Sequence, residues 1–313
     1  MKIVKPNFWD YKRPSFISYC LLPFTFPLIL NNFFLNKRRN KFKKRNIKTI
    51  CVGNIYVGGT AKTPLTIKLD QILKKLKFKT GTIKKYYKDQ LDEQHLLKKK
   101  TNLYCSKKRI KALDGAIKDN IDIAIFDDGL QDSSINYDLS FVCFNINNWI
   151  GNGFLIPAGP LREKLKSISK YDAIFLNGHE EDVSELKKII KKYNSSIKIF
   201  ETSYIATNID KIDIRSNYLI FSGIGNPEGF KKTLIKNNIN IIAELVFPDH
   251  YTYTFDDIKK IRLKALSLNA KLLTTEKDFV KLKNYTPNDI KFLQIDILVK
   301  HEAELINFIK LKI

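Results

Sequence analysis

A lysine followed by a threonine ends a short glycine-containing turn, and this pair could bind phosphate. The residues before the turn, Thr49 to Val52, form an apolar run typical of a buried strand, and helical periodicity continues afterwards to about Leu76. Strand, glycine-rich turn, Lys-Thr and helix is the layout of a P-loop, whose backbone N–H groups cradle phosphates. The residues predicted to bind a nucleotide in this way are Gly58, Gly59, Thr60, Ala61, Lys62 and Thr63.

The chemistry of the last two residues suggests their roles. Lys62 can reach the terminal phosphates, and the hydroxyl of Thr63 can ligate Mg²⁺. The usual pattern, G-x-x-x-x-G-K-[ST], is not met in full, because Tyr56 and Ala61 occupy its two glycine positions. The turn therefore needs support from a second group of residues.

Two carboxylates at the end of another apolar strand give that support. Residues Ile121 to Phe126 form the strand, and Asp127, Asp128 and Gly129 follow it. The carboxyl end of a strand beside a P-loop is where a Walker-B-type Mg²⁺ ligand belongs in a parallel sheet. Asp-Asp-Gly is also a common turn sequence, so turn chemistry alone is the alternative. The upstream P-loop favours the metal site.

Further strand ends carry polar residues and predict a second α/β unit. Each is a common strand-to-helix turn when taken alone, but together their loops supply Asp, His, Glu and Lys side chains. The strands with the loops that follow them are Phe141–Phe144 with Gly151–Arg162, Tyr218–Phe221 with Ser222–Pro227, Asn240–Val246 with Phe247–Tyr251, and Leu272-Leu273 with Thr274–Asp278.

An uncharged, apolar segment, Phe16 to Leu35, lies near the amino terminus. Its length would let a helix cross a bilayer, but Pro23, Pro27 and several polar residues interrupt it. Basic residues flank it on both sides, including the run Lys37–Arg45, which suits a helix lying on anionic headgroups of the cytoplasmic interface. A spanning helix and a buried hairpin are the alternatives. No small-residue cleavage site follows, which disfavours a signal peptide.

The composition excludes several classes of protein. The chain has 313 residues, 44% of them apolar, and a formal net charge of +23, so it is neither a disordered acidic chain nor a disulfide scaffold. Four scattered cysteines without a CxxC pair and four histidines predict a reducing compartment and no structural zinc. The charge allows nucleic acid as a partner, but no zinc-finger spacing or RNP-like motif supports it, so none is expected.

The chain resembles the tetraacyldisaccharide 4′-kinases, the lipid A biosynthesis kinases of Gram-negative bacteria. The resemblance runs along nearly the whole chain in family order. The stretches that carry it are Val52–Asn54 with Gly58–Pro64, Asp127–Gln131, Gly151–Gly153 with Pro157–Glu163, and Phe247–His250, together with Gly223–Pro227 and Thr275–Asp278.

The resemblance implies a membrane-associated ATP-dependent kinase. It would transfer the γ-phosphate, with Mg²⁺, to the 4′-hydroxyl of tetraacyldisaccharide 1-phosphate, an anionic glycolipid, at the cytoplasmic face of the inner membrane. By the resemblance, Lys62 and Thr63 contact phosphate and Mg²⁺, and Asp127 and Asp128 complete the metal side. Asp92 would be the general base.

The same resemblance gives His250 the task of orienting or assisting Asp92. If Asp92 is not the base, the neighbouring Glu93 is the next candidate. The resemblance also implies an amino-terminal membrane-associated helix with a basic flank, residues 1–46, followed by two α/β/α domains. Residues 47–163 would be the P-loop kinase domain, and residues 164–313 would be a second α/β domain that closes the active-site cleft.

The chain departs from the family pattern at three places. Ala61 stands where a glycine is usual, Asp132 stands where a histidine is usual, and the segment Thr82–Asp89 is shortened and lacks an arginine. These departures leave two alternatives open: a P-loop NTPase switch, or a kinase acting on a different glycolipid.

Overall fold

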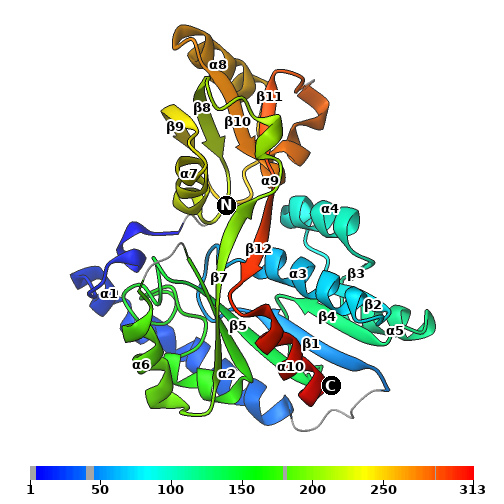
Figure 1. The fold of residues 1–313 in the computed structure, drawn as a ribbon. Helices are drawn as coiled ribbons and strands as arrows, with labels where there is room; N and C mark the ends of the chain where they lie inside the picture. The colour runs from blue at the N-terminus through cyan, green and yellow to red at the C-terminus, as the bar shows by residue number, and fades with distance from the viewer. Residues whose placement is uncertain (1–4, 40–45, 179–181, 286) are drawn as a thin grey trace. The chain divides into compact units, whose positions relative to one another are not determined.

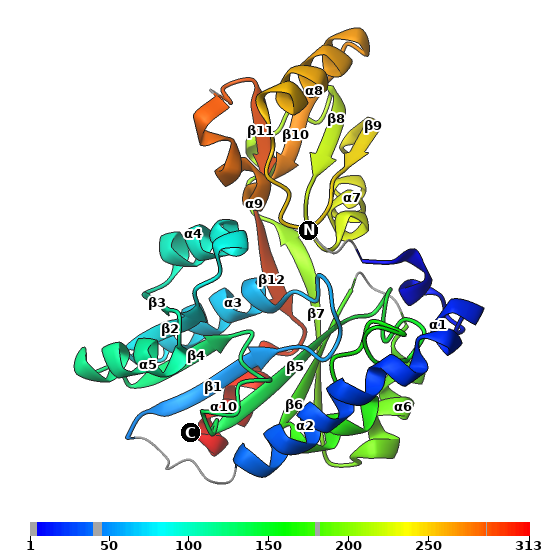
Figure 2. The same cartoon turned by 180° about the vertical axis from the view of Figure 1, so that it is seen from behind.

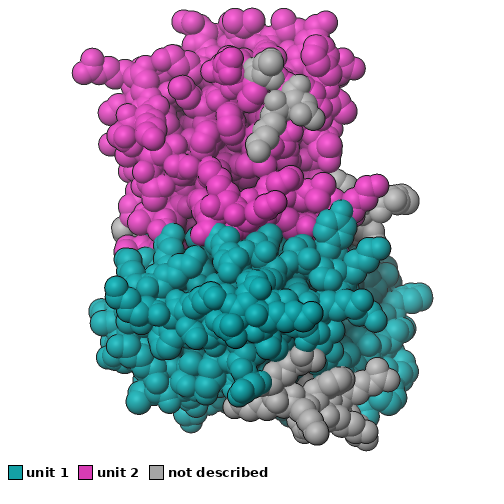
Figure 3. Space-filling model, turned by 90° about the vertical axis from the view of Figure 1, so that its right-hand side faces the viewer, with its two compact units in different colours: residues 1–86, 101–203, 299–313 teal, residues 87–100, 204–298 magenta. Residues whose placement is uncertain are grey.

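The computed structural model describes residues 5–39, 46–178, 182–285 and 287–313. The chain forms two compact units, coloured separately in Figure 3. Unit 1 consists of Met1–Tyr86, Thr101–Ser203 and Val299–Ile313, and unit 2 consists of Tyr87–Lys100 and Tyr204–Leu298. The chain therefore passes between the units four times.

An eight-stranded sheet, counted over the described residues, forms the centre of unit 1 (Figure 1). Its order is β12-β7-β6-β5-β1-β4-β2-β3, and the registered pairs from β3 to β7 are parallel. Its inner strands are apolar and buried, as expected of a parallel sheet covered on both faces. The strands are β1 (Lys48–Gly53), β2 (Thr80–Lys85), β3 (Leu103–Ser106), β4 (Ile123–Asp127), β5 (Leu139–Asn145), β6 (Ala173–Asn177), β7 (Lys198–Ala206) and β12 (Ile295–Val299).

Helices cover both faces of this sheet. Val142 of β5 belongs to a core that includes residues of α5 (Arg109–Lys118) and α6 (Ser184–Tyr193). The preceding residue of the strand, Phe141, packs against Phe308 of α10 (Glu302–Lys312). Because neighbouring strand residues point to opposite faces, α10 lies on the face opposite α5 and α6. Unit 1 is thus a three-layer α/β/α structure, and α3 (Lys62–Lys75) packs against β1, β2 and β4.

Unit 2 repeats this plan around a four-stranded sheet of order β11-β10-β8-β9, counted over its described residues. All of its registered pairs are parallel. Leu219 and Phe221 of β8 share a core with α8, whereas Tyr218 and Ile220 share a core with α7, so the two helices cover opposite faces. The elements are β8 (Asn217–Ser222), β9 (Asn240–Val246), β10 (Lys271–Thr275), β11 (Ile290–Leu293), α4 (Leu91–Lys100), α7 (Pro227–Lys236), α8 (Phe255–Ser267) and α9 (Glu276–Phe279). The predicted α/β fold with parallel sheets is confirmed.

The amino-terminal segment is broken into short helices, which Figure 2 shows in blue. They are α1 (Phe16–Cys20), the 3₁₀ turn Leu22–Thr25 and α2 (Phe26–Arg39). The interruption at Pro23 fits the loss of a backbone donor at each proline. In the part of the chain that the structure describes, no helix combines the length and apolar character needed to cross a bilayer. Residues 40–45 of the basic flank lie outside the described residues.

The compact units divide the chain at other positions than the expected domains 1–46, 47–163 and 164–313. β6 and β7 follow residue 163 but extend the sheet of unit 1, because β6 pairs in parallel register with β5 and with β7. The carboxyl-terminal helix α10 also belongs to unit 1. In contrast, α4 lies within the expected P-loop domain by sequence but belongs to unit 2.

Candidate active site

The glycine-containing turn connects β1 to α3 in unit 1. Lys62 is the first residue of α3, so the helix begins where the P-loop pattern predicts. Its N-cap residue, Ala61, has φ 66° and ψ 20°, the left-handed region that favours glycine. Glycine would adopt this conformation with less strain than alanine, because it has no Cβ. Asn54 holds the turn by donating from Nδ2 to Oγ1 of Thr60 at 3.0 Å.

The register of the sheet brings the first carboxylate to the turn. Val52 of β1 pairs with Asp127 of β4, so both strands end at the same edge. Asp127 is fully buried, and its Oδ2 accepts a hydrogen bond from the Thr63 hydroxyl at 3.1 Å. A P-loop hydroxyl bonded to a strand-end carboxylate is the arrangement expected around nucleotide-bound Mg²⁺.

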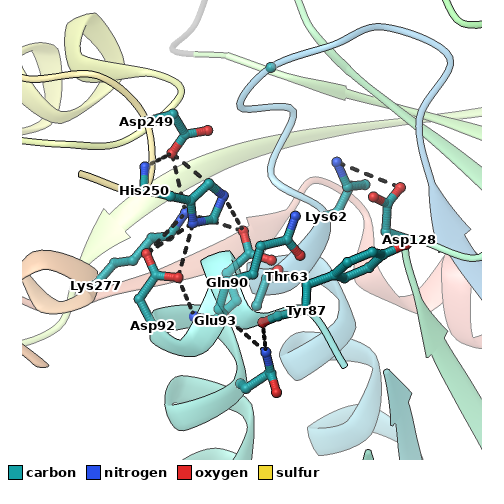
Figure 4. A network of polar contacts seen from close by, with 12 residues as sticks. Lys62, Thr63, Tyr87, Gln90, Asp92, Glu93, Asp128, Asp249, His250 and Lys277 are labelled. Atoms are coloured by element: carbon teal, nitrogen blue, oxygen red, sulfur yellow. Dashed lines mark hydrogen bonds and ion pairs between the residues drawn. The ribbon is translucent and has the colours of Figure 1, made fainter. Parts of the chain in front are cut away.

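Basic side chains surround the second carboxylate. Asp128 lies 3.1 Å from Nη1 of Arg162 and 3.8 Å from Nζ of Lys62 (Figure 4 labels Lys62 and Asp128). Burial by itself would raise the pKa of Asp128, but the charges of Lys62, Arg162, Lys84 and Arg109 outweigh it and lower the pKa. Asp128 is therefore held as a carboxylate.

Lys84 is a site residue that sequence reasoning missed. It is 2% exposed, it pairs with Asp127 in the register of β2 and β4, and its Nζ lies 2.6 Å from Oδ2 of that carboxylate. The available signal was its position at the carboxyl end of a strand in a parallel sheet, where polar side chains gather. Arg109 was also missed, and it donates to the backbone carbonyl of Asp128.

Asp92 and His250 meet within unit 2, although 158 positions separate them in the sequence. Asp92 lies in the first turn of α4, and His250 follows the end of β9 with φ 57°. The imidazole Nδ1 lies 3.0 and 3.1 Å from the two carboxylate oxygens (Figure 4). Burial alone would raise the pKa of Asp92, but the hydrogen bond from His250 and the charge of Lys277 bring it down to about 2.

The residues predicted for the site thus form one group in each unit. Lys62, Thr63, Asp127 and Asp128 lie together in unit 1, and Asp92 and His250 lie together in unit 2. Among the described residues there is no cluster of three or more His, Cys, Asp or Glu side chains suited to hold a metal. Mg²⁺ is commonly bound through one or two carboxylates, with phosphate and water in the rest of its shell, so the two aspartates and the Thr63 hydroxyl fit that ion.

A strand–turn–helix that presents Lys-Thr beside a strand-end carboxylate defines the class of P-loop phosphotransferases and NTPases. The family described as tetraacyldisaccharide-1-P 4′-kinase matches residues 20–313, and the chain belongs to this family. The kinase activity expected from the sequence is therefore confirmed at the level of the family.

Individual relatives agree with this assignment. A tetraacyldisaccharide 4′-kinase of Pelagibacter ubique is 48% identical over 98% of this chain and 97% of its own length. One of Rickettsia bellii is 34% identical over 90% of each chain. The crystal structure of the "apo" form of LpxK from Aquifex aeolicus in complex with ATP has a TM-score of 0.71 and 25% identity, covering 94% of this chain and 98% of its own.

Proposed function

We propose that this chain transfers the γ-phosphate of ATP to the 4′-hydroxyl of tetraacyldisaccharide 1-phosphate. The observation that carries the proposal is that one member of this family has both a nucleotide-binding group of residues and a group suited to an acceptor hydroxyl. The first is the Thr63–Asp127 contact beside Lys62, which suits a metal–nucleotide complex. The second is the Asp92–His250 pair, which suits a hydroxyl acceptor.

The P-loop residues bind and orient the nucleotide. The turn Gly58–Ala61 and the first backbone N–H groups of α3 cradle the phosphates, and Lys62 contacts the terminal ones. Thr63, Asp127 and Asp128 would hold Mg²⁺, which would neutralise charge on the phosphate oxygens when bound. Ion pairs with Arg162 and Lys84 fix the carboxylates of Asp128 and Asp127 in place.

Asp92 receives the proton of the sugar hydroxyl. A pKa of about 2 makes it a weak base, but phosphoryl transfer has a loose transition state that needs a positioned acceptor more than a strong base. His250 fixes the direction of the carboxylate through Nδ1. This division of labour accounts for a carboxylate that stays ionised and is almost fully buried, with 3% of its side chain exposed.

The amino-terminal segment binds the membrane interface in this proposal. Its polar residues Ser18 and Thr25 are buried, whereas Phe16 is 82% exposed, the reverse of a buried hairpin. Such an exposed apolar surface suits an interfacial contact with lipid. Its other exposed apolar side chains are Ile17, Tyr19, Leu22, Phe24, Phe26, Leu30, Phe33 and Phe34. The enzyme would then work at the cytoplasmic face of the inner membrane, where its acylated substrate lies.

The reaction is tested with γ-labelled ATP, Mg²⁺ and tetraacyldisaccharide 1-phosphate in detergent micelles. Wild type and Lys75→Ala, an exposed control at the other end of α3, should label the lipid, and Lys62→Ala should lose transfer by orders of magnitude. ATP hydrolysis without labelled lipid would favour an NTPase switch or another acceptor. Normal transfer by Lys62→Ala would remove the P-loop assignment.

Membrane binding is tested by sedimentation with vesicles containing anionic phospholipid. The variant Phe16→Asp/Phe24→Asp should bind at least about tenfold more weakly, because two exposed rings no longer enter the interface. Phe255→Asp on α8 is the matched control, since Phe255 is also exposed but lies in unit 2. Equal binding by all three proteins would contradict an interfacial role for the segment.

A further inference from the structure

Lys277 belongs to the sequence motif Thr275–Asp278, to which the proposed mechanism gives no task. The motif begins α9 at the carboxyl end of β10, and its backbone is fixed by buried bonds. Oγ1 of Thr275 accepts from the Asp278 backbone N–H at 3.0 Å and donates to its Oδ2 at 2.8 Å. The backbone N–H of Gly223 donates to the same carboxylate oxygen at 3.0 Å. Lys277 therefore extends from a rigid support.

The ammonium of Lys277 lies among three carboxylates. Its Nζ is 3.2 Å from Oε1 of Glu93, 3.4 Å from Oδ1 of Asp249 and 3.7 Å from Oδ2 of Asp92 (Figure 4). Only 18% of the side chain is exposed. All four residues belong to unit 2, so these contacts lie within one compact body.

The same three carboxylates surround the imidazole of His250. Nδ1 contacts Asp92, and Nε2 lies 3.7 Å from Oε1 of Glu93 and 3.8 Å from Oδ1 of Asp249. Lys277 and His250 thus share every one of these carboxylates. A change in the charge of Lys277 must therefore reach the Asp92–His250 pair through short distances.

The other charged groups near the pair come from the elements packed against α4. Lys281, in the 3₁₀ segment Val280–Tyr285, lies 3.4 Å from Oδ2 of Asp92 and 2.8 Å from Oδ1 of Asp278. Its ammonium also lies over the ring of Tyr253. Among the described residues of this cluster, four carboxylates, those of Asp92, Glu93, Asp249 and Asp278, face the two lysines. The cluster carries an excess of negative charge that Lys277 reduces.

The electrostatics agree with this geometry. Burial alone would lower the pKa of Lys277, but Glu93, Asp249 and Asp92 outweigh it and raise the pKa above its ordinary value. Conversely, the charge of Lys277 helps to lower the pKa of Asp92. Because its pKa is raised, the Lys277 ammonium stays charged and can serve as a fixed counter-ion to these carboxylates.

We propose that Lys277 is a positioning residue for the Asp92–His250 pair, whose ammonium holds the carboxylates of Asp92, Glu93 and Asp249 in place around the imidazole. The inference rests on the proposed function, because it assumes that this pair serves the acceptor hydroxyl. Lys277 itself need not touch the substrate. Its positive charge acts on Asp92, whose ionised form it favours.

The test is the pH profile of kcat/KM for lipid phosphorylation in wild type, Lys277→Arg and Lys277→Met. Removing a cation makes every neighbouring group easier to protonate, so the profile of Lys277→Met should move to higher pH by about one unit. Lys277→Arg keeps the charge and should stay near the wild-type profile. Lys271→Met is the matched control, since Lys271 lies on the preceding strand and pairs with Asp213 outside the cluster.

A double variant separates charge from packing. Lys277→Met/Asp249→Asn removes one charge of each sign and should return the profile toward that of wild type. A lower rate in Lys277→Met with an unmoved profile would mean a purely structural role and would overturn the inference. A shifted profile that the double variant does not restore would overturn it as well.

A second readout does not depend on catalysis. If Lys277 holds Asp92 ionised, the difference in unfolding free energy between wild type and Lys277→Met is largest above about pH 5 and narrows as Asp92 protonates. A difference that is constant with pH would overturn the inference. A different result would count against the proposed function alone. In that case wild type labels no lipid, but the difference in unfolding free energy between wild type and Lys277→Met still narrows at low pH.

Discussion

The two units each contain a charged cluster, and the two clusters differ in the sign of their excess charge. Among the described residues, the P-loop cluster of unit 1 sets four cations against three carboxylates: Lys62, Lys84, Arg109 and Arg162 against Asp127, Asp128 and Asp132. The Asp92–His250 cluster of unit 2 has more carboxylates than lysines. A cationic cluster is suited to bind phosphates, and an acidic one is suited to receive a proton from a hydroxyl.

The two clusters are also assembled differently. In unit 1 the register of neighbouring strands does the work, since β1, β4 and β2 end together and bring Asp127 beside Thr63 and Lys84. In unit 2 the pair depends on α4, a helix whose chain lies between two strands of unit 1. The residues of the first cluster are brought together by the register of adjacent strands. Those of the second come together because the chain leaves unit 1 to form α4 in unit 2.

The largest effect is expected from breaking the buried ion pair in unit 1. Asp127→Asn leaves the ammonium of Lys84, which is 2% exposed, facing a neutral amide. Loss of one partner of a buried pair costs about 3–5 kcal/mol, so the free energy of unfolding in denaturant should fall by that amount. Phosphate transfer should also fall by orders of magnitude, because the carboxylate that we propose as a ligand of Mg²⁺ is lost.

The matched control is Lys84→Met/Asp127→Asn, which removes both charges. Its unfolding free energy should recover most of the loss, since no buried charge is left without a partner. If the double variant is as unstable as Asp127→Asn, the pair does not govern the stability of this cluster.

A substitution in the unit 2 cluster is expected to lower the rate of phosphate transfer and to have less effect on stability. Asp92→Asn keeps the shape of the side chain but cannot accept a proton, so kcat should fall by about 10²- to 10³-fold while KM for ATP changes little. Steady-state kinetics with both substrates varied measures this split. An unchanged kcat would move the acceptor role to another group, of which Glu93 is the first candidate.

Much of the unit 1 cluster could be predicted from the sequence. The apolar run before Asp127 and the turn before Lys62 indicate strands, and a parallel sheet places their carboxyl ends at one edge. Lys84 was missed because its strand, Thr80–Lys85, has Ile83 as its one apolar side chain and so lacks a clear hydrophobic pattern. Its burial depends on its ion pair with Asp127, which is a tertiary contact.

The unit 2 cluster was predicted only through the family resemblance. No local pattern brings Asp92 close to His250, because the contact requires α4 to leave the unit that contains its neighbouring strands. Neither Tyr87 nor Lys100 lies in a Gly- or Pro-rich linker that would indicate this crossing. The carboxylates around Lys277 were likewise beyond reach, since they come from distant segments of the chain.

The smallest effect is a pH dependence of stability, which sharpens the comparison between the clusters. The folded-state pKa of Asp92 is about 2, below its ordinary value of 3.8. Stability from a carboxylate with a depressed pKa is present above the unfolded pKa and is lost as pH falls through the folded pKa. Asp92 should thus contribute about 2 kcal/mol at neutral pH that disappears between about pH 4 and pH 2.

Denaturant unfolding of wild type and Asp92→Asn across this pH range measures the contribution. The difference between the two proteins should shrink as the pH falls toward 2, because Asp92 is then increasingly protonated and comes to resemble the neutral asparagine of the variant. Parallel curves would show that the contacts of Asp92 with His250 and Lys277 do not favour its ionised form. Asp128, whose pKa is also lowered, offers the same measurement in the cationic cluster. If the stability difference from wild type shrinks at low pH for a variant at Asp128 as it does for Asp92→Asn, then local contacts hold both carboxylates ionised. This would be so although one cluster has an excess of cations and the other an excess of carboxylates.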